Sequence, residues 1–292
     1  MIITQLIGGL GNQMFQYALG RRLSCMHNVP LKLDITGFKD YSLRTYRLNH
    51  FALHADFASD KDIDDVKFHN RTGILRTLDS LAGHLQPYYR RNVYKEPHFQ
   101  YDPNILKCKP DVYLEGYWQT EKYFSHIADA IRRDFTIAEN PDPRNREMAD
   151  IIRDCEAVSL HVRRGDYVSN PVTNAYHGTC REDYYRQAIR IIEKQVENPR
   201  FFLFSDDPSW VSEHMDTGHP TTYMDINGPE KDYEDMRLLS LCRHHIIANS
   251  SFSWWGAWLC SNPGKMVIAP QRWFTKRDIN TRDITPQEWT RI

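Results

Sequence analysis

Two adjacent arginines and an aspartate stand in the segment His161-Val-Arg-Arg-Gly-Asp-Tyr, directly after an apolar run at residues 157–162. A guanidinium presents several N–H donors in a planar fork, and that fork matches the oxygens of a phosphate group. Consecutive side chains at a strand end point in opposite directions. We therefore expect one of Arg163 and Arg164 to face a ligand, and the other to orient Asp166 or the loop. The alternative is a structural Arg–Asp pair.

Two further segments carry groups suited to a nucleotide. Phe201-Phe-Leu-Phe-Ser-Asp-Asp ends in Asp206 and Asp207, which could hold a divalent metal or accept hydrogen bonds from a base or ribose. Asp207 before Pro208 also fits an ordinary helix start. Asn249-Ser-Ser-Phe-Ser-Trp-Trp-Gly-Ala-Trp-Leu places serines before a helix. There, hydroxyls, free N–H groups and the helix dipole form an anion site, and the tryptophans have the spacing of core residues.

A glycine-rich turn opens the chain, in Gly8-Gly-Leu-Gly-Asn-Gln-Met-Phe-Gln-Tyr. Its spacing is typical of the start of a dinucleotide-binding fingerprint, and Asp34 stands near where a ribose-binding acid would be. However, Met14 replaces the third glycine, which disfavours nicotinamide binding. We interpret Asn12 and Gln13 as polar groups presented to a ligand, with Asn12 as a plain helix cap the alternative.

The elements that position these residues alternate along the chain. The first part predicts a strand at residues 2–7, a helix at about 12–26 and a strand at 31–34. The second part predicts strands at 157–162, 201–205, near 222, 246–249 and 266–270, and helices at 182–196, near 208, 233–242 and 254–260. Strands that alternate with helices indicate a parallel sheet covered on both faces.

The chain has 292 residues, which favours two domains. The polar stretch 139–147 contains two prolines and is the best linker candidate. We therefore expect an α/β protein with Rossmann-like domains at 1–146 and 147–292, and a ligand in the cleft between them. Residues 39–102 are harder to interpret. They contain helix-like pieces at 61–68 and 74–85 and a basic, aromatic segment at 88–91, either a solvated loop or an acceptor or membrane-surface contact.

Composition excludes several classes of protein. Lys+Arg number 37 against Asp+Glu 38, a net charge of −1, which argues against nucleic acid as a partner. No apolar run approaches the ~20 residues of a membrane span, and the N-terminus is not a signal peptide. The six cysteines contain no Cys-x-x-Cys pair and are expected to be free thiols. We expect a cytoplasmic protein, with contact at the inner face of the cytoplasmic membrane left open.

Taken together and in this order, the segments that begin at Gly8, His161 and Asn249, with Phe204-Ser-Asp-Asp between the last two, resemble the bacterial α-1,2-fucosyltransferases of glycosyltransferase family 11. The resemblance covers nearly the whole chain. It implies a GT-B type fold, GDP-fucose as donor, inversion at the anomeric carbon, and no metal or other cofactor. It also implies transfer to the 2-hydroxyl of a galactose-terminated oligosaccharide or glycolipid, often in a surface polysaccharide.

The resemblance also implies roles for single residues. Arg163 would contact the diphosphate and its leaving oxygen, and His161 and Asp206 would lie near the nucleoside. The first half would present Asn12 and Gln13 toward fucose and acceptor. The residues expected near the phosphates are Ser250, Ser251, Phe252 and Ser253.

The acceptor hydroxyl must lose a proton, and Asp166 and His177, the latter on the acceptor side, are the candidate bases. Three alternatives stay open: a fucosyltransferase of another linkage, a non-catalytic protein that binds a sugar nucleotide or carbohydrate, and a nucleotide-dependent oxidoreductase.

Overall fold

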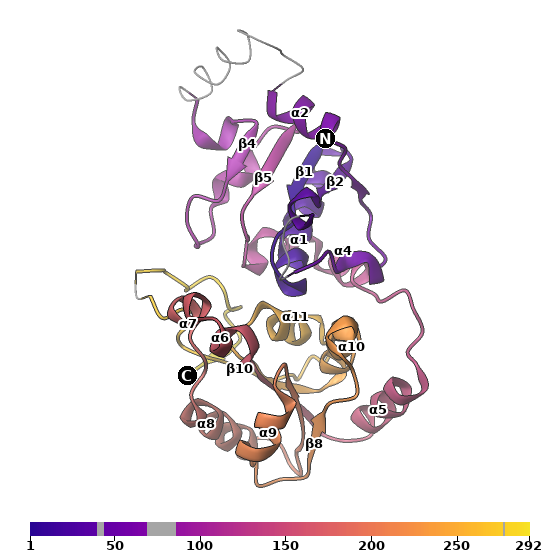
Figure 1. Ribbon diagram of the computed structural model, residues 1–292, viewed down its shortest axis with the longest axis vertical. Coiled ribbons are helices and arrows are strands. Elements are labelled where there is room, and N and C mark those ends of the chain that lie inside the picture. The colour runs from indigo at the N-terminus through magenta and orange to yellow at the C-terminus, as the bar shows by residue number, and fades with distance from the viewer. Residues whose placement is uncertain (40–43, 69–85, 277) are drawn as a thin grey trace. The chain divides into compact units, whose positions relative to one another are not determined.

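A computed structural model describes residues 1–39, 44–68, 86–276 and 278–292. They form two compact units (Figure 1). Unit 1 comprises Met1–Ala138 and Arg282–Ile284, and unit 2 comprises Glu139–Thr281 and Thr285–Ile292. The predicted boundary at 146/147 thus lies beyond the division, because helix α5 (Pro143–Arg153) already belongs to unit 2. The Asp142 side chain caps this helix by accepting from Asn145 N.

Unit 1 is built on a parallel sheet with the strand order β3-β2-β1-β5-β4. Its strands are β1 (Ile2–Gln5), β2 (Leu31–Asp34), β3 (Asp56–Phe57), β4 (Val93–Lys95) and β5 (Val112–Glu115). Its helices are α1 (Leu10–His27), α2 (Asp60–Phe68) and α4 (Ala128–Asp134) within the described ranges. The expected helix at 61–68 is confirmed as α2. The one expected at 74–85 lies outside the described residues.

Helix α1 packs closely on β1 and β2 (Figure 1). At Gly20 a side-chain carbon would lie 2.3 Å from Thr4 Oγ1, so the absence of a side chain permits this approach. The helix ends at Asn28, whose φ of 53° is left-handed and whose N–H donates to the carbonyls of Ser24 and Cys25. The chain leaves β1 toward β2, and β5 lies on the other side of β1. The strand order therefore reverses between β1 and β5, and the carboxyl ends of these two strands form the topological switch point of this sheet.

Unit 2 contains a second parallel sheet with the order β11-β10-β9-β6-β7-β8. Its strands are β6 (Ala157–Val162), β7 (Arg200–Ser205), β8 (Thr221–Met224), β9 (His244–Ile246), β10 (Val267–Ala269) and β11 (Thr290–Arg291). Beside α5 its helices include α6 (Gly165–Ser169), α7 (Pro171–His177), α8 (Glu182–Glu193), α9 (Pro208–His214), α10 (Asp232–Leu241) and α11 (Ser251–Leu259). The switch point lies between β6 and β9.

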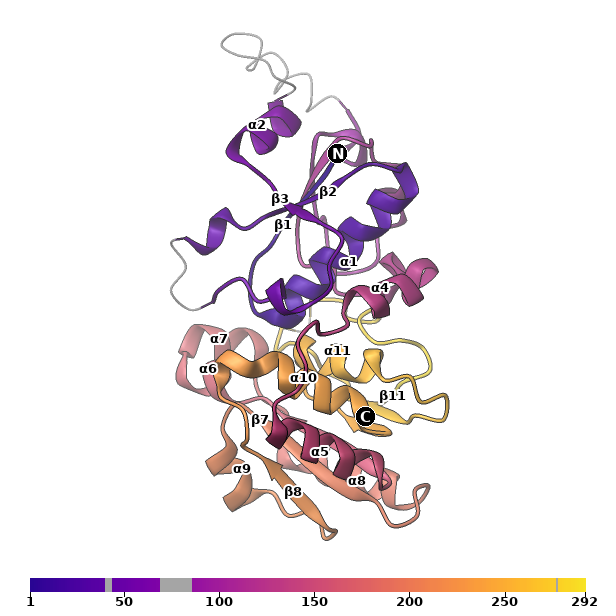
Figure 2. The same ribbon diagram turned by 90° about the vertical axis from the view of Figure 1, so that its right-hand side faces the viewer.

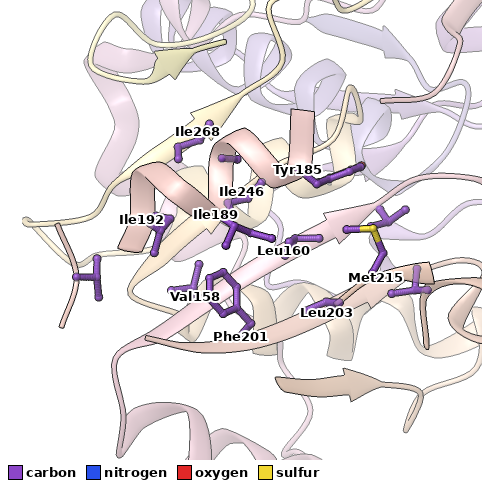
Figure 3. Close-up of a cluster of buried hydrophobic side chains, with 14 residues drawn as sticks. Val158, Leu160, Tyr185, Ile189, Ile192, Phe201, Leu203, Met215, Ile246 and Ile268 are labelled. Atoms are coloured by element: carbon purple, nitrogen blue, oxygen red, sulfur yellow. The ribbon is translucent and has the colours of Figure 1, made fainter. Parts of the chain in front are cut away.

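The side chains of this second sheet alternate between two cores. Val158 and Leu160 of β6 face a cluster that includes Ile189 and Ile192 of α8, as Figure 3 shows. Ala157 instead joins a cluster with residues of α5 and α10. Helices α10 and α11 pack against each other, and both views place them side by side (Figures 1 and 2). The predicted parallel sheet with two covered faces is confirmed.

A short piece of the C-terminal chain, Arg282–Ile284, belongs to unit 1. Asp283 is 7% exposed, accepts a hydrogen bond from Tyr101 N at 3.1 Å, and forms an ion pair of 2.5 Å with Lys122. The chain then returns to unit 2, where β11 pairs with β10. The sequence patterns did not predict this excursion.

Among the described residues, no helix has both the length and the apolar character that crossing a bilayer requires.

Candidate active site

The chemistry-bearing segments of unit 2 meet at the switch point of its sheet. The segment from His161 to Asp166 ends β6 and begins α6, and Asn249 to Ser253 follow β9 and begin α11. Because β6 and β9 are parallel neighbours, their carboxyl ends lie at one edge of the sheet. This is the position at which open α/β sheets bind their ligands.

Arg163 lies between two carboxylates at this edge. Its NH2 donates to Asp166 Oδ1 at 2.5 Å, and its NH1 lies 2.9 Å from Asp206 Oδ2. The side chain is 20% exposed, and the guanidinium lies 5.2 Å from the ring centre of Tyr167. Burial lowers the pKa of this guanidinium, but Asp206 and Asp166 raise it by more, so Arg163 stays charged. The carboxylates of Asp166 and Asp206 therefore hold the planar guanidinium of Arg163 in one orientation.

Arg164 has a different environment, as expected for consecutive residues after a strand. Its guanidinium lies 3.7 Å from the ring centre of Trp210 in α9, and its Nε lies 3.1 Å from Asp207 Oδ2. Asp207 also caps α9 by accepting from Trp210 N at 3.3 Å, so the predicted helix start at Pro208 is confirmed. Arg164 thus anchors the loop to α9, and Arg163 is the arginine at the switch point.

Asp206 links the two arginines. One oxygen pairs with Arg163, and the other accepts from Arg164 N at 2.8 Å. Its carboxylate occupies the space beside Gly165, where a side-chain carbon would lie 2.3 Å from Asp206 Oδ2. The resemblance implies that Asp206 lies near the nucleoside, which stays a prediction; in the structure its carboxylate contacts the Arg163 side chain and the Arg164 backbone.

His161 lies beneath this edge, 4% exposed, with its ring 5.6 Å from that of Phe252. Burial, with a further contribution from Arg163, lowers the pKa of His161 to about 3, so the ring is neutral at pH 7. Within the described part of the chain its Nδ1 has no hydrogen-bond partner. A buried nitrogen without a partner is costly.

Helix α11 begins at Ser251, three residues before the predicted start at Trp254. Ser250 is its N-cap residue, so the first turn directs its N–H groups and the positive end of the helix dipole toward the edge of the sheet. Ser253 is completely buried, and its hydroxyl donates to Ser250 O at 3.3 Å. The Ser253 hydroxyl thus bonds to the backbone of its own helix, and the position of residues 250–253 near the phosphates stays a prediction. The tryptophans Trp254, Trp255 and Trp258 are buried, as their spacing predicted.

Asn249 holds the loops around this edge together, a role that sequence reasoning did not assign. Its Nδ2 lies 3.0 Å from His177 O and 3.2 Å from both Gly178 O and Trp273 O. The His177 ring is stacked on Tyr167, with ring centres 4.6 Å apart. Burial lowers the pKa of His177, and Asp166 only partly offsets this, so the imidazole is neutral at pH 7.

A second polar group of unit 2 was also missed. Asp235, in the first turn of α10, accepts from Asn227 Nδ2 at 2.8 Å. Burial raises the pKa of Asp235 to about 7, although Asn227 lowers it. Asn227 in turn donates to Asn145 Oδ1 at 2.8 Å, which ties α10 to α5. The acid-rich sequence around Asp235 is typical of a solvated helix start, so no pattern marked this half-buried acid as one with a raised pKa.

In unit 1 the glycine-rich turn places Asn12 near the carboxyl end of β5. Asn12 is partly exposed, and its Oδ1 accepts from Gln119 Nε2 at 2.7 Å. Gln16, one turn later in α1, bridges the two strand ends by accepting from Ile7 N and donating to Gly116 O, both at 3.0 Å. The polar residues after the glycines thus join β1 and β5 at their switch point.

Burial corrects one expectation for unit 1, that Gln13 is presented toward a sugar. Gln13 is 0% exposed, and its amide donates to the carbonyls of Gly8 and Thr45 and accepts from Arg47 N. Its hydrogen bonds hold the backbone, so Gln13 does not face a sugar. Asp34, considered as a ribose-binding acid, is 3% exposed and accepts from Tyr113 OH and Thr36.

Across the described ranges, no three His, Cys, Asp or Glu side chains gather as a set of metal ligands. Asp206 and Asp207, the acids considered for this purpose, are both engaged by arginines.

Comparison with known proteins adds three kinds of finding. Residues 84–292 match the model of glycosyl transferase family 11. An alpha-1,2-colitosyltransferase of Escherichia coli is 36% identical, covering 100% of this chain and 99% of its own. The O-antigen biosynthesis glycosyltransferase WbnK of Escherichia coli is 34% identical, with 98% and 99% covered. The galactoside alpha-(1,2)-fucosyltransferase 2 of Hylobates lar is 25% identical, with 87% and 67% covered.

Among solved structures, that of an Arabidopsis thaliana FUT1 mutant in complex with GDP has a TM-score of 0.52 at 12% identity, covering 98% of this chain and 74% of that one. This likeness concerns the fold. Together with the two parallel-sheet units, it confirms the predicted GT-B type architecture.

Proposed function

The chain belongs to glycosyl transferase family 11, and we propose that it transfers L-fucose from GDP-fucose to the 2-hydroxyl of a galactoside, with inversion. The observation that carries the proposal is the charged fork of Arg163 at the switch point of β6 and β9, next to the N-terminus of α11. A cation and a helix N-terminus at one strand edge are together suited to a diphosphate. The α-1,2 linkage is supported by the names of two relatives.

Charge explains how this arrangement would act. As the acceptor oxygen bonds to the anomeric carbon, the bond to the β-phosphate oxygen breaks and negative charge grows on GDP. Arg163 has five N–H donors, of which two are used in its bonds to Asp166 and Asp206. Further donors of the fork and the first turn of α11 would stabilise the leaving phosphate without reorganisation, which is usually the largest catalytic contribution. We propose that no metal is needed for this step.

Asp166 and His177 remain the two candidates for the base, and the structure suggests how to separate them. Asp166 is held by Arg163, so Asp166→Asn should weaken GDP binding by releasing the fork. The neutral imidazole of His177 is the protonation state that a base requires. If His177 is the base, His177→Gln should lower kcat while GDP affinity and donor hydrolysis persist. A pH profile that loses its acid limb in one variant alone identifies the base.

One observation favours a second donor. The relative that is 36% identical over the whole chain is named a colitosyltransferase. Colitose is L-fucose without its 3-hydroxyl, so the two donors differ by a single polar group. A site built to hydrogen-bond that hydroxyl would discriminate strongly against colitose, whereas an apolar site would not. GDP-colitose is therefore the second candidate donor.

One experiment tests donor, acceptor and metal together. The protein is incubated with lactose and either GDP-fucose or GDP-colitose in excess EDTA, and the linkage of the product is read by NMR. A fucosyl-α-1,2-galactoside product in EDTA supports the proposal. Products from GDP-colitose alone would establish the second donor. Activity that returns only with Mn²⁺ or Mg²⁺ would refute the metal-independent mechanism.

A further inference from the structure

Residues 116–119, which follow β5 in unit 1, form a turn with an unusual backbone. Trp118 has a φ of 59°, in the left-handed region that bulky residues rarely adopt, and is completely buried. Its ring packs against those of Tyr94 and Tyr123, with centres 5.8 and 5.7 Å away. Strained backbone persists only where its surroundings hold it firmly, and it tends to occur at functional sites.

The Glu96 side chain fixes the 116–119 turn by hydrogen bonds to its backbone. Its carboxylate accepts from Tyr117 N at 2.7 Å and from Trp118 N at 3.1 Å. Gly116 makes this possible, because a side-chain carbon there would lie 2.8 Å from Glu96 Oε2. Gln16 holds the same turn from α1 through Gly116 O. A carboxylate, a glycine and an amide thus fix one short piece of backbone.

These hydrogen bonds fix the turn so that one aromatic ring, that of Tyr117, is exposed. Of the residues in the 116–119 turn, Tyr117 alone is exposed, at 42%. The next two residues, Trp118 and Gln119, are buried, and Gln119 donates to Asn12 Oδ1 at 2.7 Å. The exposed ring therefore lies on the same turn as the amide that orients Asn12, at the switch point of the first sheet.

We propose that the Tyr117 ring is the stacking platform for the acceptor sugar, and that Glu96 is the residue that positions it. The inference rests on the proposed function and names the acceptor subsite within it. A galactopyranose has one face that carries mainly C–H groups, which packs on an aromatic ring, and an edge of hydroxyls suited to carboxamides such as Asn12. Glu96 acts through the backbone of the turn.

The acceptor kinetics of three variants test this assignment. Tyr117→Ala should raise the acceptor KM for lactose about tenfold by loss of stacking, with the donor KM unchanged. Tyr117→Phe keeps the ring and should behave as wild type. Glu96→Gln keeps the shape but replaces one acceptor oxygen by an amide NH2 donor that would face a backbone N–H, so it should raise the acceptor KM as well.

A double variant separates positioning from general loss of structure. If Glu96 acts through Tyr117, then Glu96→Gln added to Tyr117→Ala should raise the acceptor KM no further than Tyr117→Ala alone. Phe57→Ala is the matched control, because Phe57 is another exposed aromatic of unit 1, at 54%. It should leave the acceptor KM unchanged. Multiplicative effects in the double variant would overturn the role of Glu96.

Binding without turnover keeps this inference distinct from the proposed function. Saturation-transfer NMR with methyl β-galactoside should detect binding to the wild type and its loss in Tyr117→Ala. If the wild type turns over neither sugar nucleotide, the proposed function fails, and this binding comparison still decides the subsite. The stacking role of Tyr117 would be refuted if wild type and Tyr117→Ala had the same acceptor KM or bound the galactoside equally well. It would also be refuted if the wild type did not bind the galactoside.

Discussion

Gly165 and Asp206 occupy one small space, because a methyl group on Gly165 would lie 2.3 Å from Asp206 Oδ2. The same oxygen lies 2.9 Å from the guanidinium of Arg163. The missing side chain at the start of α6 thus lets an acid that follows β7 reach an arginine that follows β6. The orientation of the arginine fork depends on this glycine.

Gly165→Ala should therefore lower activity without unfolding unit 2. Gly165 does not have a positive φ, so alanine suits its backbone, and the cost comes from the displaced carboxylate. We expect kcat/KM to fall at least about tenfold, with a stability loss on the order of 1–3 kcal/mol from overpacking. Gly37→Ala is the control, since no atom of the residues that the structure describes lies within 4 Å of its added carbon. Wild-type activity in Gly165→Ala would show that Asp206 does not orient Arg163.

Arg163→Ala should abolish turnover while the fold persists. Removal of a donor to the leaving phosphate is expected to cost about a hundredfold or more in kcat. Arg163→Lys should recover only part of it, because an ammonium lacks the planar fork. Arg186→Ala removes the same charge from an exposed surface pair with Glu182 and should remain active. A folded Arg163→Ala with wild-type kcat would exclude Arg163 from the mechanism.

Ser251→Ala should mainly weaken the binding of GDP, whereas Asn12→Ala should mainly impair catalysis or the use of the acceptor. Ser251 opens α11 at the switch point of the second sheet, so its loss should weaken GDP binding. Asn12 lies in unit 1 and accepts from Gln119, so its loss should impair catalysis or acceptor use more than GDP affinity. Titration of GDP by calorimetry measures the difference. If Asn12→Ala loses GDP binding and Ser251→Ala keeps it, the donor and acceptor roles of the two units are reversed.

Asp235 should make the stability of the protein depend on pH. Burial raises its pKa to about 7 in the folded state, from 3.8 in the unfolded chain. The folded state therefore keeps a proton that the unfolded state loses, and the free energy of unfolding falls as pH rises from about 4 to 7. Asp235→Asn should remove this dependence and stabilise the protein at pH 8 by on the order of 2–4 kcal/mol.

Denaturant unfolding at pH 4 and pH 8 measures this effect. The difference between Asp235→Asn and wild type should be small at pH 4 and large at pH 8. Asp225→Asn is the control, because Asp225 is exposed. An equal difference at both pH values would mean that the folded state does not keep the half-buried Asp235 as a neutral acid.

Strands β1 and β2 of unit 1 and β6 to β10 of unit 2 could be predicted from the sequence because they are short, largely apolar and followed by polar or glycine residues. Strands β3, β4, β5 and β11 were not predicted; β3 and β11 are only two residues long, and both residues of β3 are exposed. The arginine segment was placed correctly for the same reason, since Arg163 directly follows the buried β6. The start of α11 was placed too late because serines have weak helix propensity and suit turns as well as caps. In the structure Ser253 is instead buried inside the helix.

Contacts between distant segments set the limit of such prediction. Gln13 has the composition of a sugar-binding residue, but its bonds to Thr45 and Arg47 come from a loop far along the chain. Likewise, no local pattern connects Glu96 with the backbone N–H of Trp118. An amide or a carboxylate has the same chemistry whether it meets a ligand or its own backbone, and only the fold decides.

The ion pair between Asp283 and Lys122 has a consequence for recombination among relatives. Asp283 comes from the last residues of the chain, yet its partners Tyr101 and Lys122 lie in unit 1. A chimera that joins the first 138 residues of this chain to the remainder of a homologue would inherit its tail from the other parent. Fusion proteins of this kind should therefore exchange residues 282–284 together with the N-terminal half, so that two crossover points flank the tail instead of one at the linker.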